Sequence, residues 1–265
     1  MPPASPLTLA ATETLRKIAA APADAAQLAA ALRHLAKWRA ELLANTILER
    51  SGTKVLSGPF RGMDYAFRAS EGSRSARLLG CYEASLAPVI EAIIARAYPL
   101  VIDVGCAEGY YAVGLARRIP GARVLARDEN PKAQALCGML AARNGVADRV
   151  EVGGRMDHAD FAICADQSVL VLCDIEGAEA ELLDPVLAPG LLFADILVET
   201  HDVMRPGLSD LIASRFAASH TILRLDRKIS TDLPDWMESL SDLDRLIALW
   251  EWRGGPTPWL WMQRR

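Results

Sequence analysis

Residues 100–116 combine a short apolar run, an acidic residue, a turn of small residues and the start of a helical pattern. The apolar run 100–102 precedes Asp103, and the glycines and alanine of segment 105–109 follow at alternate positions. This order predicts a strand, a tight turn and a helix, the unit that opens a nucleotide-binding α/β sheet. Small residues let a ligand approach the backbone, and the start of a helix offers unpaired N–H groups.

The spacing of the small residues separates this turn from the one in dinucleotide-binding proteins. A dinucleotide turn needs a third glycine three positions after the second, where helix and strand pack closely. Here Tyr110 and Tyr111 follow Gly109 directly, which disfavours a nicotinamide-dependent oxidoreductase. The G-x-A-x-G spacing after an acid resembles motif I of the class I methyltransferases that use S-adenosylmethionine (SAM). In that family the turn faces the methionine and ribose parts of the cofactor.

A second acidic residue lies where a ribose would be recognised. The segment 123–127 predicts a strand that leads into Asp128, 25 positions after Asp103 and near the usual offset of about 20. A carboxylate at this strand tip can accept both ribose hydroxyls. Glu129 is the competing candidate, and Asp157, after the third strand, is expected to reach the adenine amino group. The alternative is that these acids only end strands and cap helices.

These motifs give a predicted set of cofactor-binding residues. The set comprises Asp103, Gly105, Cys106, Ala107, Glu108, Gly109, Tyr110, Asp128, Glu129 and Asp157.

The rest of the chain alternates predicted strands and helices, which is typical of a mostly parallel sheet covered on both faces. Strands are expected at 100–104, 123–127, 149–153, 169–173, 194–200, 220–226 and 258–264, and helices at 109–118, 131–144, 177–187, 206–217 and 239–250. The predicted fold class is α/β: a Rossmann-like, seven-stranded class I methyltransferase sheet with an antiparallel final strand and an N-terminal helical extension.

The N-terminal segment predicts helices. Residues 7–50 are rich in Ala and Leu, with apolar residues at helical spacing, and Ser51-Gly52 ends the pattern. We expect these helices to pack on the domain or on a second copy, which would give a homodimer; the alternative is a lid over the active site. The predicted domains are a helical extension with a turn-rich connector at 1–97 and a SAM-binding domain at 98–265.

Composition limits the class of protein. A formal charge of −4 without a block of Lys or Arg argues against a nucleic-acid partner. The 5 cysteines are scattered without C-x-x-C spacing and predict buried thiols in a reducing compartment. No secretory signal is evident, and no window of about 18 apolar residues predicts a membrane span. The expectation is a cytoplasmic protein.

A second group of polar residues follows two further predicted strands. The strand at 169–173 leads into Asp174, Glu176 and Glu179, and the next strand ends with Glu199 and His201. Ligands of open α/β sheets bind beyond the carboxyl ends of the strands. We therefore expect Asp174, Glu199 and His201 to meet Asp103 and Asp128 of the predicted SAM site at one edge of the sheet.

These motifs together resemble the FkbM-type SAM-dependent methyltransferases. The resemblance is carried by DVGCAEGYYAVGLA at 103–116, DIEGAEAELL at 174–183 and ETH at 199–201, and covers about residues 55–226. It implies SAM as cofactor and O-methylation of a hydroxyl on a sugar, glycan or natural product. The Asp-Ile-Glu-Gly segment also departs from the Asn/Asp-Pro-Pro-Tyr/Phe motif of enzymes that methylate planar amino groups.

The candidate catalytic residues are His201, Asp174 and Glu199. His201 is the best general base because imidazole titrates near neutrality, and Asp174 is expected to orient the acceptor. The same three residues are the predicted ligands of a divalent cation, Mg²⁺ or Mn²⁺. A structural role for His201 and Glu176 stays open. So does the alternative function, a non-catalytic SAM-binding module whose helical N-terminus is a partner surface.

Overall fold

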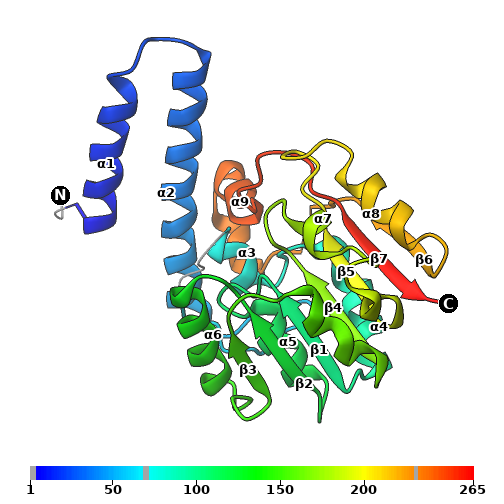
Figure 1. The fold of residues 1–265 in the computed structure, drawn as a ribbon. Helices are drawn as coiled ribbons and strands as arrows, with labels where there is room; N and C mark the ends of the chain where they lie inside the picture. The colour runs from blue at the N-terminus through cyan, green and yellow to red at the C-terminus, as the bar shows by residue number, and fades with distance from the viewer. Residues whose placement is uncertain (1–3, 68–71, 230–231) are drawn as a thin grey trace.

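The computed structural model describes residues 4–67, 72–229 and 232–265. A seven-stranded sheet with the order β3-β2-β1-β4-β5-β7-β6 lies at its centre (Figure 1). The strands are β1 (Leu100–Val104), β2 (Arg123–Arg127), β3 (Val150–Gly153), β4 (Val169–Cys173), β5 (Asp195–Glu199), β6 (His220–Leu225) and β7 (Trp259–Arg264). The first five are parallel, and β7 runs antiparallel to both β5 and β6. The predicted sheet, including its antiparallel final strand, is confirmed.

The strands are apolar on both faces because helices cover both faces. Alternate residues of a strand face opposite sides, so Val101 lies in one core cluster while Leu100 and Ile102 lie in the other. The first cluster includes residues of α4 (Ala87–Arg96), α5 (Tyr110–Arg118) and α6 (Pro131–Arg143). The second includes residues of α7 (Glu179–Leu182), α8 (Leu208–Phe216) and the 3-10 helices η2 (His158–Ala165) and η3 (Pro189–Phe193).

The helix after β4 is much shorter than predicted. The sequence pattern suggested a helix over 177–187, whereas α7 covers only Glu179–Leu182. Pro185 disfavours helical backbone at the residue before it and cannot donate a backbone hydrogen bond. At the other end, Gly177 has a φ of 103°, which is incompatible with a helix. The other predicted helices of the sheet domain agree with the structure to within three residues.

The N-terminal segment forms two antiparallel helices, α1 (Pro6–Ala19) and α2 (Ala25–Ser51), which project from the sheet domain (Figure 1). The second half of α2 is anchored in the first core cluster through Leu43, Ala44 and Ile47. The first half is not: Leu28 and Leu32 are 69% and 71% exposed. The predicted apolar face is therefore covered along only part of its length.

The connector between α2 and the sheet packs against the same core. It contains an antiparallel bridge between Lys54 and Asp64, the helix α3 (Arg74–Leu79) and the 3-10 turn η1 (Ala84–Leu86). Val55, Met63 and Tyr65 lie in the first core cluster with residues of β1 and β2. The C-terminal connection holds η4 (Asp235–Ser239) and α9 (Asp242–Leu249), which lies against α2.

One described stretch, Arg74–Arg96, is long and apolar enough by composition to cross a membrane. It is divided among α3, η1 and α4, and Gly80 ends α3 in the left-handed region. Its buried residues, such as Leu78 and Ile93, belong to the first core cluster. Core helices commonly have this composition, so the stretch is weak evidence for a span.

The cysteines behave as the sequence suggested. All are free and buried, at positions 81, 106, 137, 164 and 173.

Candidate functional site

A cavity of about 1030 Å³ lies at the carboxyl ends of the central strands. Its lining includes residues that follow β1, β2, β4 and β5, and the 250–257 loop before β7. The strand order reverses between β1 and β4, since β2 and β3 lie on one side and β5 on the other. Such a reversal point is where open α/β sheets bind ligands. Arg33 and Lys37 of α2 complete the lining.

The glycine turn after β1 brings its backbone very close to the segment after β4. Gly105 has a φ of 82°, and a Cβ atom there would lie 1.6 Å from the carbonyl oxygen of Asp174. Only glycine fits this position, for steric as well as conformational reasons. The glycine therefore lets the turn after β1 pack directly against the segment after β4, and both Gly105 and Asp174 line the cavity.

Asp128 is held by the backbone of two different turns. One of its carboxylate oxygens accepts a hydrogen bond from the Ala107 N–H at 2.9 Å, and the other accepts one from the Asn130 N–H at 2.7 Å. These bonds fix the carboxylate beside the glycine turn and leave acceptor capacity on both oxygens. Glu129 also lines the cavity, but its side chain is 74% exposed and contacts Arg155 at 3.6 Å. The geometry thus favours Asp128 over Glu129 as the ribose ligand.

The predicted cofactor residues divide into two sets. Gly105, Ala107, Asp128, Glu129 and Asp157 line the cavity, as expected. The others, contrary to expectation, do not: Asp103, Cys106, Glu108, Gly109 and Tyr110. After Ala107 the chain turns into α5, whose first turn faces the core rather than the cavity.

Two members of the second set have identifiable structural partners. Glu108 is 1% exposed, accepts the Tyr65 hydroxyl and contacts the Arg77 guanidinium at 3.3 Å. Tyr110 packs edge-to-face on Phe60 and Tyr65.

Asp103 is also buried, at 1% exposure. Burial raises its pKa to about 7, against the opposing effect of the nearby Ala112 backbone N–H in the first turn of α5.

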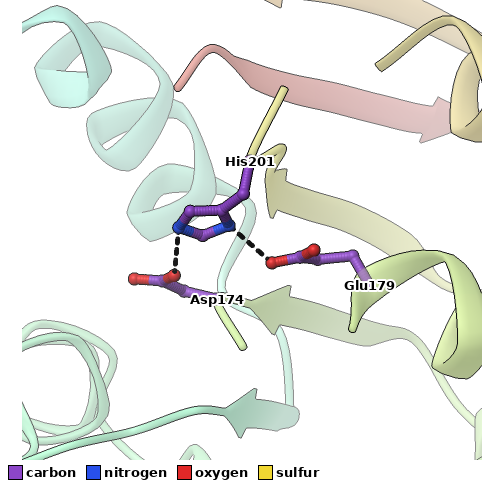
Figure 2. A group of neighbouring side chains, drawn as sticks. All are labelled: Asp174, Glu179 and His201. Atoms are coloured by element: carbon purple, nitrogen blue, oxygen red, sulfur yellow. Dashed lines mark hydrogen bonds and ion pairs between the residues drawn. The ribbon is translucent and has the colours of Figure 1, made fainter. Parts of the chain in front are cut away.

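The catalytic candidates meet at the other side of the cavity. His201 lies with its Nε2 atom 3.6 Å from Asp174, 3.4 Å from Glu176 and 3.9 Å from Glu199. Its Nδ1 atom lies 2.7 Å from the Oε1 atom of Glu179 (Figure 2). The edge-of-sheet arrangement expected for Asp174, Glu199 and His201 is therefore present. Glu179 belongs to the quoted motif but had no role in the sequence-based prediction.

The electrostatics of this cluster follow from its four carboxylates. Burial opposes the imidazolium form of His201, but the hydrogen bond to Glu179 and the charges of Glu199, Glu179 and Glu176 raise its pKa overall. Loss of hydration and the neighbouring charges of Glu199, Glu83 and Glu176 raise the pKa of Asp174 well above its usual value. The cluster thus favours protonated forms of His201 and Asp174.

Arg253 is a functional candidate that the sequence did not reveal. Its guanidinium contacts Glu83, Glu199 and the Thr257 hydroxyl, and lies 3.0 Å from Glu251. It belongs to a Gly- and Pro-containing loop, where nothing in the local pattern indicates a buried cation. This contact fixes Glu199 and ties the loop before β7 to the end of β5.

The divalent-cation site predicted at Asp174, Glu199 and His201 gains no support from this geometry. Arg253 already supplies a positive charge to Glu199, the third expected ligand. Ligand atoms of Asp174, Glu179 and His201 do lie within 4.8 Å of one another, and they are the candidate metal group among the described residues. However, the 2.7 Å separation of Nδ1 and Oε1 is a hydrogen-bond distance, and a cation shared by these two groups would have to break that bond. We therefore assign no step to a metal ion.

Comparison with known proteins adds weak similarities. No protein-family model matches the chain, and no curated protein matches it. Similar solved structures include an O-methyltransferase from Bacillus cereus in complex with SAH, at 12% identity over 66% of this chain and 78% of that one, with a TM-score of 0.44. A second is the O-methyltransferase TomG from Streptomyces achromogenes in complex with SAM, at 15% identity, 65% and 77% coverage and a TM-score of 0.43.

A third is an rRNA methylase from Streptococcus thermophilus, at 11% identity, 67% and 96% coverage and a TM-score of 0.43. Similarities at this level carry no argument about activity.

Proposed function

We propose that this chain is a SAM-dependent methyltransferase of the FkbM type that methylates a hydroxyl group of a sugar, glycan or natural product. The observation that carries the proposal is the tethering of Asp128 to the Ala107 and Asn130 backbone, beside the side-chain-free turn at Gly105. A carboxylate fixed in this way suits the two ribose hydroxyls of SAM. His201 lies on the same cavity, and its neutral form, which the raised pKa shifts to higher pH, can act as a proton acceptor.

Bound SAM would supply a methyl group already activated by its sulfonium, so the chain has to place an acceptor oxygen in line with the methyl–sulfur bond. Positioning of this kind contributes up to about 7–11 kcal/mol in favourable intramolecular cases. As the oxygen–carbon bond forms, the carbon–sulfur bond breaks and S-adenosylhomocysteine leaves. The hydroxyl proton passes to Nε2 of His201, a transfer that adds about 10²–10⁴-fold to the rate.

The acidic side chains near Nε2 would assist this proton transfer. Asp174 is partly exposed to the cavity, and its raised pKa favours the protonated form, which can orient the acceptor by donating a hydrogen bond to its oxygen. Glu199 is held by Arg253 and stabilises the positive charge that His201 acquires. Both roles need the cluster geometry described above and no additional cofactor.

Calorimetric titration of SAM tests the cofactor site. We expect Asp128→Ala to weaken SAM binding by about tenfold to one-hundredfold, because charge-assisted hydrogen bonds contribute about 1.5–3 kcal/mol. Glu129→Ala is the matched control, since it removes the neighbouring exposed carboxylate and is expected to bind SAM as the wild type does. Equal affinity of wild type and Asp128→Ala would remove Asp128 from the ribose site.

Methyl transfer is tested separately with SAM labelled in its methyl group and a panel of saccharide and phenolic hydroxyl acceptors. We expect label in a product of the wild type and much less with His201→Ala. SAM binding without any methylated product across the panel would favour the non-catalytic module instead.

A further inference from the structure

Glu179 is the most completely buried acid of the cluster, with 0% exposure, although it lies only a few residues from the cavity. It is the first residue of the short helix α7, two residues after the last residue of the Asp-Ile-Glu-Gly turn. A buried carboxylate is costly unless hydrogen bonds hold it. The hydrogen bonds of the Glu179 carboxylate therefore indicate its role.

The turn supplies the backbone donors that stabilise this carboxylate. The Oε1 atom accepts hydrogen bonds from the Ile175 N–H at 3.3 Å and the Gly177 N–H at 3.1 Å. The backbone between them is unusual, because Glu176 has a φ of 54° and Gly177 a φ of 103°. Residues other than glycine rarely adopt such angles, and they persist where the surroundings enforce them. The turn is thus folded around the Glu179 side chain.

The same oxygen holds the imidazole of His201 at its Nδ1 atom, 2.7 Å away (Figure 2). A neutral imidazole has one N–H, and an ionised carboxylate can only accept. The proton of the neutral ring is therefore expected on Nδ1. Nε2, which lies 3.6 Å from Asp174 at the cavity, then carries a free lone pair.

The other carboxylates cannot replace Glu179 in this role. Asp174 and Glu199 lie 3.6 and 3.9 Å from Nε2, beyond hydrogen-bond distance. Glu176 lies at 3.4 Å, but its side chain is 56% exposed and not fixed by burial. Glu179 is also the one of these four carboxylates that contacts Nδ1 rather than Nε2.

We infer that Glu179 is a positioning residue: it fixes the ring orientation and the Nδ1–H tautomer of His201, so that Nε2 is presented to the acceptor as a proton acceptor. The catalytic consequence rests on the proposed methyltransferase function, whereas the tautomer does not. Carboxylate partners of functional histidines commonly act in this way, by fixing the tautomer and stabilising the imidazolium that forms.

The tautomer can be measured without any substrate. ¹⁵N-histidine-labelled protein is examined by NMR at alkaline pH, where the rings are neutral, and the spectrum of His201→Asn identifies the His201 signals among those of the 4 histidines. We expect the His201 proton on Nδ1 in the full-length wild type. A proton mainly on Nε2, or an even mixture of both forms, would overturn the inference.

Kinetics test the consequence, with the acceptor that the labelled-SAM panel identifies. Glu179→Gln keeps an oxygen acceptor for the two backbone N–H groups but removes the charge. We expect kcat to fall about 10–100-fold, with KM and SAM affinity little changed. The control is Asp184→Asn, which removes a carboxylate just after α7 and outside the cavity lining and is expected to keep wild-type kcat.

An unchanged kcat in Glu179→Gln would contradict the inference, as would a loss of SAM affinity parallel to the loss of kcat, since that indicates a general structural role. Should Glu179→Gln fail to fold, the wild-type spectrum and the shorter carboxylate of Glu179→Asp decide the question. Absence of methyl transfer by the wild type would reject the proposed function and leave the tautomer result standing.

Discussion

Replacing Arg253 with methionine should strongly destabilise the protein. Methionine keeps an unbranched, flexible side chain but has no charge, so the substitution removes the cation shared by Glu83, Glu199 and Glu251. Glu251 keeps a second cation, Arg227, at 3.0 Å. Among the described residues, the carboxylate of Glu83 would keep its hydrogen bond from the Tyr111 hydroxyl, and Glu199 would lose the partner of its Oε1 atom. Both side chains are 3% exposed.

The expected cost follows from this change in partners. Removing one member of a buried ion pair costs about 3–5 kcal/mol, because a buried charge is left without compensation. Protonation limits the cost at lower pH. Burial and the charge of Glu199 raise the pKa of Glu83 to about 7, against the opposing effect of Arg253. In the variant that opposition is gone, so the pKa of Glu83 rises further.

The pH dependence has a definite sign. A carboxyl whose pKa is raised by folding binds its proton more tightly in the folded state, so stability is lost as pH rises through the folded pKa. In the wild type that loss lies between the ordinary value of 4.5 and about 7. In Arg253→Met it continues above pH 7. The destabilisation should therefore be about 3–5 kcal/mol at pH 8 and smaller at pH 7 by up to about 1.4 kcal/mol.

Urea unfolding followed by tryptophan fluorescence measures this difference, from the midpoint and slope at each pH. Arg245→Met is the matched control, because it removes an exposed ion pair with Glu238 and should cost at most about 1 kcal/mol. A cost below about 1 kcal/mol for Arg253→Met at pH 8, or a larger cost at pH 7 than at pH 8, would refute the reasoning.

Three further predictions concern other parts of the fold. Gly105→Ala should reduce stability by more than about 4 kcal/mol or prevent folding, because its Cβ would meet the Asp174 carbonyl, whereas Gly154→Ala has open space and should shift the thermal midpoint little. Arg77→Met should cost about 3–5 kcal/mol in urea unfolding by removing a buried cation that contacts Glu108; a cost like that of a surface pair would contradict this. A homodimer formed through the N-terminal helices predicts that Leu28→Lys combined with Leu32→Lys lowers the sedimentation coefficient to that of a monomer with an unchanged thermal midpoint, and a monomeric wild type would reject the dimer.

The order of strands, turns and helices could be predicted from the sequence because each depends on a local pattern. The apolar runs at 100–102 and 169–173 mark two strands, 100–104 and 169–173, and both strands are buried along their whole length. Gly105 and Asp128 could also be predicted from local patterns, since a tight turn and a strand tip need particular residue types. The length of α7 was not predicted correctly. The apolar spacing of 177–187 indicated one helix, but Gly177 and Pro185 each disfavour helical backbone near the ends of that segment.

Local sequence patterns were thus sufficient to predict the sheet, the ligand crevice at its carboxyl edge and the residue types in that crevice. The partners of the polar side chains are visible only in the folded chain, where Glu179 contacts Nδ1 of His201, Arg253 contacts Glu199, and Arg77 contacts Glu108. The two residues of each pair are far apart in the chain. Which residues pair depends on which polar side chains are buried together in the folded core. Burial strengthens these electrostatic contacts. A sequence pattern shows neither which polar side chains are buried nor which of them are neighbours.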